Sequence, residues 1–269
     1  MKGNNDMQKI LNIWYQGYLE VDALPEYQNL LTKHINTLRN NDVEISIHGM
    51  PKDFFYGTSP AEVTRYASSS MIFSNQILLN AMQAEEEKFD GLILGTIQNL
   101  ALQETKSLID IPVVGYGEAA MSYANKKGEK FAVLAFNPNL LELIDLQINN
   151  SDFKKNAAPS ILINLEYNDV IYAFRDPAKL IEEFQKSVIQ AKKQDVKIII
   201  PGQMVLAELL WINKINRLED IEIIDAMKTS IEAIIDKIKN KTNLESGFWI
   251  STPPNSLKKI MKDKLQDHK

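Results

Sequence analysis

The sequence predicts an α/β protein made of two pseudo-symmetric lobes, each a mainly parallel sheet flanked by helices, with the active-site cleft between them. Strand-like and helix-like segments alternate nearly throughout the chain, which is typical of a parallel sheet covered by helices. One plan also occurs twice, at residues 90–115 and 196–225: a short apolar run that ends in glycine, a helical pattern, and a second apolar run. Internal similarity of this kind indicates two related half-units that face each other across a cleft.

Short apolar runs and alternating segments predict the strands. The alternation of Val43-Glu-Ile-Ser-Ile47 has the period of two that a half-buried strand shows. The first strand is expected to end at Trp14 and to lead into a loop that contains Tyr15, Gln16 and Gly17. The expected strands cover residues 9–14, 43–47, 91–95, 111–115, 130–136, 161–165, 196–200 and 221–225.

Apolar residues at helical spacing fill the intervals between these strands. The longest helical pattern runs over 61–88, after turn residues at 56–60, and ends in the charged run Glu85-Glu-Glu-Lys88. The polar tail from Asn243 is expected to be a partly ordered surface segment. The other expected helices cover residues 25–38, 118–127, 178–194, 204–215 and 226–238.

The chain is expected to cross between the lobes near Gly115 and to return near Asp225. The first lobe is then discontinuous and holds residues 1–115 and 226–269. The second lobe holds residues 116–225. At 269 residues, the chain is long enough to bury a substantial core in such an arrangement.

Composition excludes several classes of function. The formal charge of −5 gives no broad attraction to nucleic acid or to anionic lipid. The apolar runs are too short to span a bilayer, and the first residues lack a signal-peptide hydrophobic segment, so a cytoplasmic location is expected. The chain has no cysteine, which rules out disulfides, thiolate catalysis and cysteine-ligated metals.

Polar residues follow two predicted strands at matching positions, Thr96 in the first half and Gln203 in the second. Open α/β sheets bind ligands beyond the carboxyl ends of their strands. The segment 96–99 and the turn 57–59 also offer hydroxyls, amides and backbone N–H groups, which bind small carboxylates. Helix capping by Thr96 or Ser59 is the plain alternative.

Two titratable residues are candidates for proton transfer. Glu118 lies in the first turn of a predicted helix, where a carboxylate either serves catalysis or only caps the backbone. His48 ends a predicted strand, where it either acts as a general acid or base or fills a structural role. His34 and His268 are scattered, and no two histidines have ligand spacing, so no metal site is expected.

The stretch Gly115-Tyr-Gly117-Glu-Ala-Ala120 formally matches a dinucleotide-binding glycine pattern. That pattern needs an acidic residue at the end of the next strand, to hold a ribose. The next strand ends in Phe136-Asn137 without a carboxylate, and Glu118 adds negative charge where a pyrophosphate would lie. We therefore reject a nucleotide site.

Four segments together resemble the aspartate/glutamate/hydantoin racemase superfamily, over roughly Ile10 to Ile235. The most specific is Ile111-Pro-Val-Val-Gly-Tyr-Gly-Glu-Ala-Ala120. The others are Asp90-Gly-Leu-Ile-Leu-Gly-Thr96, Ile198-Ile-Ile-Pro-Gly-Gln203 and Ile223-Ile-Asp-Ala226. The resemblance implies two pseudo-symmetric lobes around a small carboxylate or cyclic amide, and no metal or organic cofactor. It also implies a cysteine from each lobe flanking the substrate carbon, at the positions that Thr96 and Gln203 occupy here.

This replacement removes the usual proton-transfer route. A thiol is partly ionised at neutral pH, whereas a threonine hydroxyl holds its proton far more tightly and a glutamine amide has no useful acid–base equilibrium. Each pKa unit of mismatch costs about 1.4 kcal/mol. We therefore expect thiol-free chemistry, with Thr96 and Gln203 orienting the substrate and Glu118 or His48 handling protons.

The expected function is that of a cofactor-independent, racemase-like isomerase acting on a small carboxylate, hydantoin-like ring or amide. A hydrolase or lyase for a cyclic amide or malonate-type acid is one alternative. A non-catalytic small-metabolite binding protein is another, and a homo-oligomer stays open. The expected substrate-binding residues are Tyr15, Gln16, Gly57, Thr58, Ser59, Gly95, Ile97, Gln98, Asn99, Gly202 and Met204.

Overall fold

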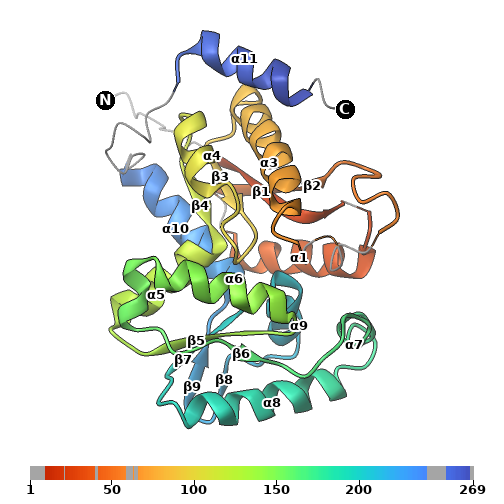
Figure 1. The fold of residues 1–269 in the computed structure, drawn as a ribbon, viewed down its shortest axis with the longest axis vertical. Coiled ribbons are helices and arrows are strands. Elements are labelled where there is room, and N and C mark those ends of the chain that lie inside the picture. Colours follow the sequence, from red (N-terminus) through yellow and green to blue (C-terminus); the bar gives the residue numbers. More distant parts are fainter. Residues whose placement is uncertain are drawn as a thin grey trace, which may run out of the picture.

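The structure is a computed structural model, which describes residues 10–20, 22–39, 42–58, 63, 66–240 and 253–266. Its first sheet has parallel strands in the order β2-β1-β3-β4 (Figure 1). Alternate residues of these strands face opposite sides, so Trp14 packs toward one layer of helices and Ile13 toward the other. The strand bounds are Leu11–Glu20 for β1, Val43–Met50 for β2, Gly91–Leu94 for β3 and Val113–Gly115 for β4.

The second sheet has the order β6-β5-β7-β9-β8, and all its pairs are parallel except β8 with β9. The two sheets together confirm the predicted α/β fold with two sheet-based lobes. The strand bounds are Phe131–Ala135 for β5, Ile161–Leu162 for β6, Ile198–Pro201 for β7, Arg217–Leu218 for β8 and Ile221–Ile223 for β9.

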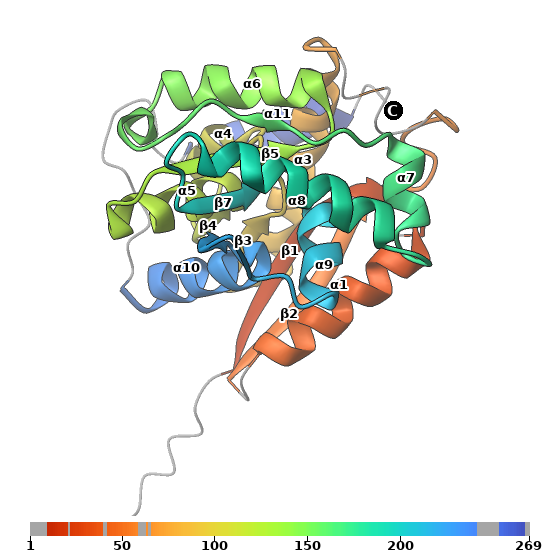
Figure 2. The same cartoon turned by 90° about the horizontal axis from the view of Figure 1, so that it is seen from below.

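Helices cover both sheets and fill the space between them (Figures 1 and 2). In the first lobe, α3 and α4 pack on the Trp14 face of the sheet, and α1 and α10 pack on the Ile13 face. In the second lobe, α8 covers the outer face of the sheet, while α5 and α6 lie on its inner side. The helix bounds are Pro25–Leu38 for α1, Ser69–Glu86 for α3, Leu102–Leu108 for α4, Tyr116–Lys127 for α5, Pro138–Asn149 for α6, Tyr167–Tyr172 for α7, Ala178–Lys192 for α8, Met204–Ile212 for α9, Ala226–Asn240 for α10 and Asn255–Gln266 for α11.

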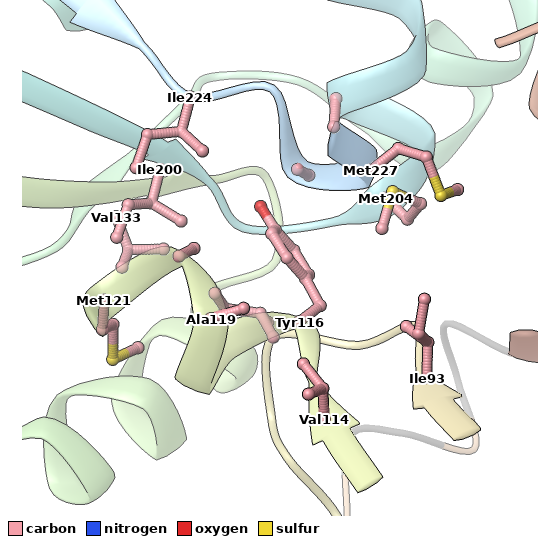
Figure 3. Packing of buried hydrophobic residues seen from close by; sticks show 14 of the residues in the cluster. Ile93, Val114, Tyr116, Ala119, Met121, Val133, Ile200, Met204, Ile224 and Met227 are labelled. Atoms are coloured by element: carbon pink, nitrogen blue, oxygen red, sulfur yellow. The ribbon is translucent and has the colours of Figure 1, made fainter. Parts of the chain in front are cut away.

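A continuous hydrophobic core joins the two lobes. It contains Ile93 and Val114 from the first sheet, Val133 and Ile200 from the second, and Tyr116 between them (Figure 3). The Tyr116 hydroxyl donates a hydrogen bond to the backbone oxygen of Pro201, at the end of β7. The ends of β3 and β7 are therefore held by shared packing across the lobe boundary.

The chain ends on the first lobe. Helix α10 returns from β9 and packs on β3 and β4, and α11 packs on α3. Ion pairs hold α11 there: Lys258 with Glu85 at 2.9 Å and with Asp110 at 3.7 Å, and Lys262 with Glu86 at 2.6 Å. Across the described residues, no helix has both the length and the apolar character needed to cross a bilayer.

Several predicted boundaries are wrong. Strand β1 continues from Leu11 to Glu20, so Tyr15 and Gln16 lie inside a strand and not in a loop. The helix expected over 61–88 begins at Ser69, after a turn at 66–68. Part of that prediction, residues 61, 62, 64 and 65, lies outside the described residues. The tail expected to be partly ordered contains a regular helix, α11, which is stabilised by its packing on α3.

Candidate functional site

A cavity of about 160 Å³ lies between the two lobes, at the carboxyl ends of β3, β5 and β7. The first lobe contributes the ends of β1 and β3, the segment before α1, and Tyr27 of that helix. The second lobe contributes the ends of β5 and β7 and the starts of α6, α7 and α9. The lining residues are Tyr18, Leu19, Leu24, Tyr27, Gly95, Thr96, Ile97, Gln98, Phe136, Asn137, Leu140, Tyr167, Ile171, Gly202, Gln203, Met204 and Val205.

The segment after β3 places Thr96 in this cavity. A side chain at Gly95 would put its Cβ 2.2 Å from the Tyr15 hydroxyl oxygen, so only glycine fits directly before Thr96. Beyond Thr96, Asn99 adopts a left-handed conformation with φ of 50° and its side chain accepts a hydrogen bond from the Glu118 backbone N–H at 3.1 Å. The close contact of Gly95 with Tyr15 and the hydrogen bond between Asn99 and α5 thus fix the segment that carries Thr96.

The segment after β7 places Gln203 in the same cavity. A Cβ on Gly202 would lie 2.5 Å from Cβ of Ala135, so the second lobe also needs glycine just before its polar residue. Gln203 is the N-cap residue of α9, and its side chain makes no capping hydrogen bond. The backbone N–H groups of the first turn of α9 therefore remain for other acceptors, and the helix dipole favours an oxygen at this end.

Buried polar atoms without partners gather at this cavity. They are the hydroxyls of Tyr18 and Thr96, which interact with each other outside normal hydrogen-bond geometry, and both polar atoms of the Gln203 amide. None of these atoms has a partner with normal hydrogen-bond geometry within the described residues. Buried polar groups in folded proteins are normally hydrogen-bonded, and each one left without a partner costs about 1–3 kcal/mol. A cavity that concentrates such atoms is therefore suited to a polar ligand.

Among the described residues, the lining contains no Asp, Glu, Lys, Arg or His side chain. Burial raises the pKa of the Tyr18 phenol well above its ordinary value of 10.0, although the interaction with the Thr96 side chain lowers it somewhat. Burial likewise raises the pKa values of Tyr27 and Tyr167. At neutral pH this described part of the lining is therefore uncharged, and it can donate and accept hydrogen bonds but offers no side chain that exchanges protons readily.

Glu118, predicted to handle protons, does not line the cavity. Its carboxylate lies 2.5 Å from Nζ of Lys106 and 3.7 Å from Nζ of Lys237. These contacts tie α5 to α4 and α10, so the structure gives Glu118 the local structural role and not the catalytic position. Its place in the first turn of a helix was compatible with both interpretations.

His48, the other proton-handling candidate, does not line the cavity either, but it lines a neighbouring pocket that shares Leu19, Leu24 and Tyr27 with the cavity. Its ring stacks on the Trp14 ring with centroids 3.3 Å apart and planes 6° apart, and its edge meets Phe89. Burial lowers its pKa below the ordinary 6.5, while the charge of Glu87 raises it. The structure therefore favours an aromatic packing role for His48.

The predicted binding residues fall into two groups. Gly95, Ile97, Gln98, Gly202 and Met204 line the cavity with Thr96 and Gln203. Tyr15 and Gln16 do not, because they point into the packed interior on the two faces of β1. Gln16 accepts hydrogen bonds from Trp14 at 3.0 Å and from Asn80 at 2.9 Å.

The remaining predicted binding residues also lie elsewhere. Asn99 caps α5 instead of lining the cavity. Gly57 and Thr58 are exposed in a turn that does not reach it. Ser59 lies outside the described residues.

The sequence did not predict any of the aromatic residues that line the cavity, which are Tyr18, Tyr27, Phe136 and Tyr167. Tyr18 was missed because the first strand was predicted to end too early; in the longer strand, its hydroxyl reaches the cavity. Phe136 and Asn137 follow β5, so the same strand-end rule that found Thr96 could have found them. Tyr27, Tyr167 and Ile171 come from helices whose relation to the cavity depends on how the lobes pack.

The glycine pattern at 115–117 has a packing explanation. A Cβ on Gly117 would lie 2.2 Å from the backbone oxygen of Ile97, so glycine allows α5 to approach the segment after β3. This agrees with the rejection of a nucleotide site. Among the described residues, no group of three or more His, Cys, Asp or Glu side chains is arranged to hold a metal ion.

Several solved structures with the same fold are racemases. Allantoin racemase from Klebsiella pneumoniae superposes with a TM-score of 0.73 at 16% identity, covering 90% of this chain and 94% of that chain. Allantoin racemase from Pseudomonas fluorescens gives 0.70 at 14% identity, with 90% and 97% covered. Glutamate racemase RacE1 from Bacillus anthracis gives 0.59 at 13% identity, with 97% and 95% covered. These likenesses define the fold class.

The family follows from the sequence match. The Asp/Glu/Hydantoin racemase family model matches residues 48–234, which is more than half of the chain. The chain therefore belongs to the Asp/Glu/Hydantoin racemase family, which confirms the resemblance seen in the sequence. No curated protein matches the sequence at a significant level.

Proposed function

We propose that this protein binds a small cyclic amide of the hydantoin type in the interlobe cavity and acts on it as a cofactor-independent, thiol-free member of the racemase family. The observation that carries the proposal is the buried, unpartnered amide of Gln203, together with the hydroxyls of Thr96 and Tyr18. Two of the structurally similar proteins are allantoin racemases, and allantoin contains a hydantoin ring.

The chemistry of the cavity favours an amide over a charged amino acid. A primary amide presents one donor and one acceptor side by side, which complements the N–H and C=O of a ring amide. The part of the lining that the structure describes provides no cation to pair with a second carboxylate and no carboxylate to pair with an ammonium group. A neutral ring therefore satisfies the cavity without leaving a buried charge unpaired.

The proposed reaction needs only hydrogen-bond donors from the protein. Hydroxide from solvent removes the proton beside a ring carbonyl, the electron pair moves onto the carbonyl oxygen, and water returns a proton to the carbon. Donors such as Gln203 Nε2 and the Tyr18 hydroxyl stabilise the negative oxygen, because they are already fixed in place. Without a side-chain base, the rate should rise with hydroxide concentration.

Replacing Gln203 by methionine should have opposite effects on stability and on binding. The change removes two buried polar atoms that have no partner, so the free energy of unfolding should rise by about 1–2 kcal/mol. It also removes the donor–acceptor pair offered to the ligand, so the affinity for hydantoin should fall at least about tenfold. Urea unfolding and isothermal titration calorimetry with hydantoin measure the two effects.

Gln185→Met is the matched control, because Gln185 is exposed on α8 and far from the cavity. It should change neither quantity appreciably. Hydantoin binding that is equally strong in wild type and Gln203→Met would show that the amide is not the recognition element. If the wild type binds glutamate but no hydantoin, the ligand class is wrong.

A second candidate function is metabolite binding without turnover, and the lack of a readily titrating side chain among the described lining residues favours it. Incubation of the protein with a chiral 5-substituted hydantoin in D₂O separates the candidates. An isomerase exchanges the ring C–H for deuterium and racemises the compound faster than buffer does. A hydrolase or lyase instead yields a new product, and a binding protein gives thermal stabilisation with neither change.

A further inference from the structure

His34 connects both lobes through its two ring nitrogens. It lies on α1 and is 1% exposed. Its Nδ1 lies 3.0 Å from both carboxylate oxygens of Glu208 on α9, and its Nε2 lies 3.1 Å from Oδ2 of Asp225. Figures 1 and 2 show α1 of the first lobe beside α9 of the second. We call His34, Glu208 and Asp225 the clasp.

The geometry of the clasp favours a protonated imidazole. Ionised carboxylates only accept hydrogen bonds, so beside two of them both ring nitrogens of His34 donate. Burial raises the pKa of Glu208, while the hydrogen bond and charge of His34 lower it. A neutral ring has one N–H and would set a nitrogen lone pair against a carboxylate oxygen. The Trp211 ring stacks on His34 with centroids 3.9 Å apart and planes 15° apart, which further favours a cation.

The clasp lies directly behind the cavity. Glu208 lies about one helical turn beyond Met204, the first residue of α9, and Gln203 is the N-cap residue of the same helix. Asp225 follows β9 and caps α10, where its Oδ1 accepts a hydrogen bond from the Lys228 backbone N–H at 2.9 Å. A charged contact with α1 therefore fixes the helix that carries Gln203 and the point at which the chain returns to the first lobe.

We propose that the clasp positions the N-terminus of α9, and with it the Gln203 side chain, against the first lobe. His34 is thus a positioning residue for the cavity, which it does not itself line. Only the ligand readout of this inference rests on the proposed function. The helix-positioning readout needs no ligand.

Solvent reaches the clasp from one side. The Asp225 side chain is 30% exposed and lines a groove of about 640 Å³. Burial lowers the pKa of His34, but the hydrogen bonds and charges of Asp225 and Glu208 outweigh this and raise it to about 9. Loss of that proton should loosen the start of α9.

Other titratable groups also face the clasp. Burial raises the pKa values of Tyr15, Tyr27 and Tyr116 above their ordinary 10.0. On the groove side, Lys228 pairs with Glu232 at 3.9 Å. A change near pH 9 that disappears when His34 is replaced is therefore assigned to His34.

The test compares wild type with His34→Gln and with the double variant His34→Gln/Glu208→Gln, which avoids an unpaired buried carboxylate. Hydrogen exchange at neutral pH should be at least about tenfold faster at the hydrogen-bonded amides at the start of α9, from Ala207 on, in both variants, with α8 of the same lobe as internal control. Tryptophan fluorescence of wild type should titrate near pH 9, because protonated His34 contacts Trp211, and both variants should lose this transition. Trp14→Phe controls for the Trp14–His48 stack.

Affinity for hydantoin, measured in parallel, should fall about tenfold in the variants and in wild type above pH 9. Unchanged exchange at the start of α9 overturns the inference, as does equal acceleration throughout α8, which indicates general destabilisation. A missing fluorescence transition in wild type also overturns it. If the exchange and fluorescence results hold but no variant or wild type binds hydantoin, the proposed function fails and the positioning role stands.

Discussion

Replacement of Gly117 by alanine should lower the free energy of unfolding by about 3 kcal/mol. Helix propensity alone predicts the opposite sign, because alanine in a helix is favoured over glycine by about 1 kcal/mol. A steric clash outweighs this preference, because the new Cβ would lie 2.2 Å from the backbone oxygen of Ile97 and 2.9 Å from Asn99 Nδ2. Backbone cannot rotate away as a side chain can, so α5 and the segment that carries Thr96 must separate.

The same helix offers a matched control. Gly128 is the C-cap of α5, and a Cβ there would meet nothing within 4 Å, although its φ of 67° disfavours other residues. Gly128→Ala should therefore cost only about 1 kcal/mol, from backbone conformation alone. Urea unfolding of both variants measures the difference. Equal small losses would show that the close approach at Gly117 relaxes without strain.

The stability of the wild-type protein should fall by about 3 kcal/mol as pH rises from about 6.5 to about 9. His34 is the cause, because contacts with Asp225 and Glu208 outweigh burial and raise its pKa from 6.5 to about 9. A raised pKa means that the folded state holds the proton more tightly than the unfolded state. The contribution of His34 to the free energy of unfolding is complete below pH 6.5 and is lost as the pH rises to about 9.

Burial raises the pKa of Glu208, while its contacts with His34 lower it, so the pH dependence belongs to the pair. The other shifted groups named here act outside this pH window. Burial lowers the pKa of His48, so its contribution appears only below 6.5, where it is lost as pH falls. The buried tyrosines and the paired Lys186 have raised pKa values that matter only above about 10. Urea unfolding across the window should thus give a slope in wild type and a nearly flat profile in His34→Gln. A slope that persists in the variant would assign the effect to another group.

The two-lobed α/β fold could be predicted because its signals are local. Short apolar runs, glycines at their ends and helical spacing repeat along the chain, and a parallel sheet needs such alternation. Errors occurred where local signals weaken. The polar residue Gln16 suggested the end of β1, yet Trp14 and Asn80 satisfy its side chain inside the sheet.

The sequence likewise predicted some of the candidate site residues and not others. Thr96 and Gln203 reach one cavity because each follows the carboxyl end of a parallel strand, which is a rule of the fold class. His48 follows the predicted strand 43–47, but in the structure it lies within β2 and stacks on Trp14. Glu118 on α5 pairs with Lys106 on α4, a contact that the sequence pattern does not indicate. Side-chain partners of this kind are set by packing.

The sequence by itself determined the alternating architecture, the family and the absence of thiols, because these depend on residue order and residue type. Only the tertiary structure decided that the described residues around the cavity between the lobes form an uncharged lining with unpartnered amide and hydroxyl atoms. It also brought His34 against Glu208 and Asp225, which lie far from it in the chain. The physical reason is that burial and pairing depend on which surfaces meet, and the meeting of two lobes has no local signal in the sequence.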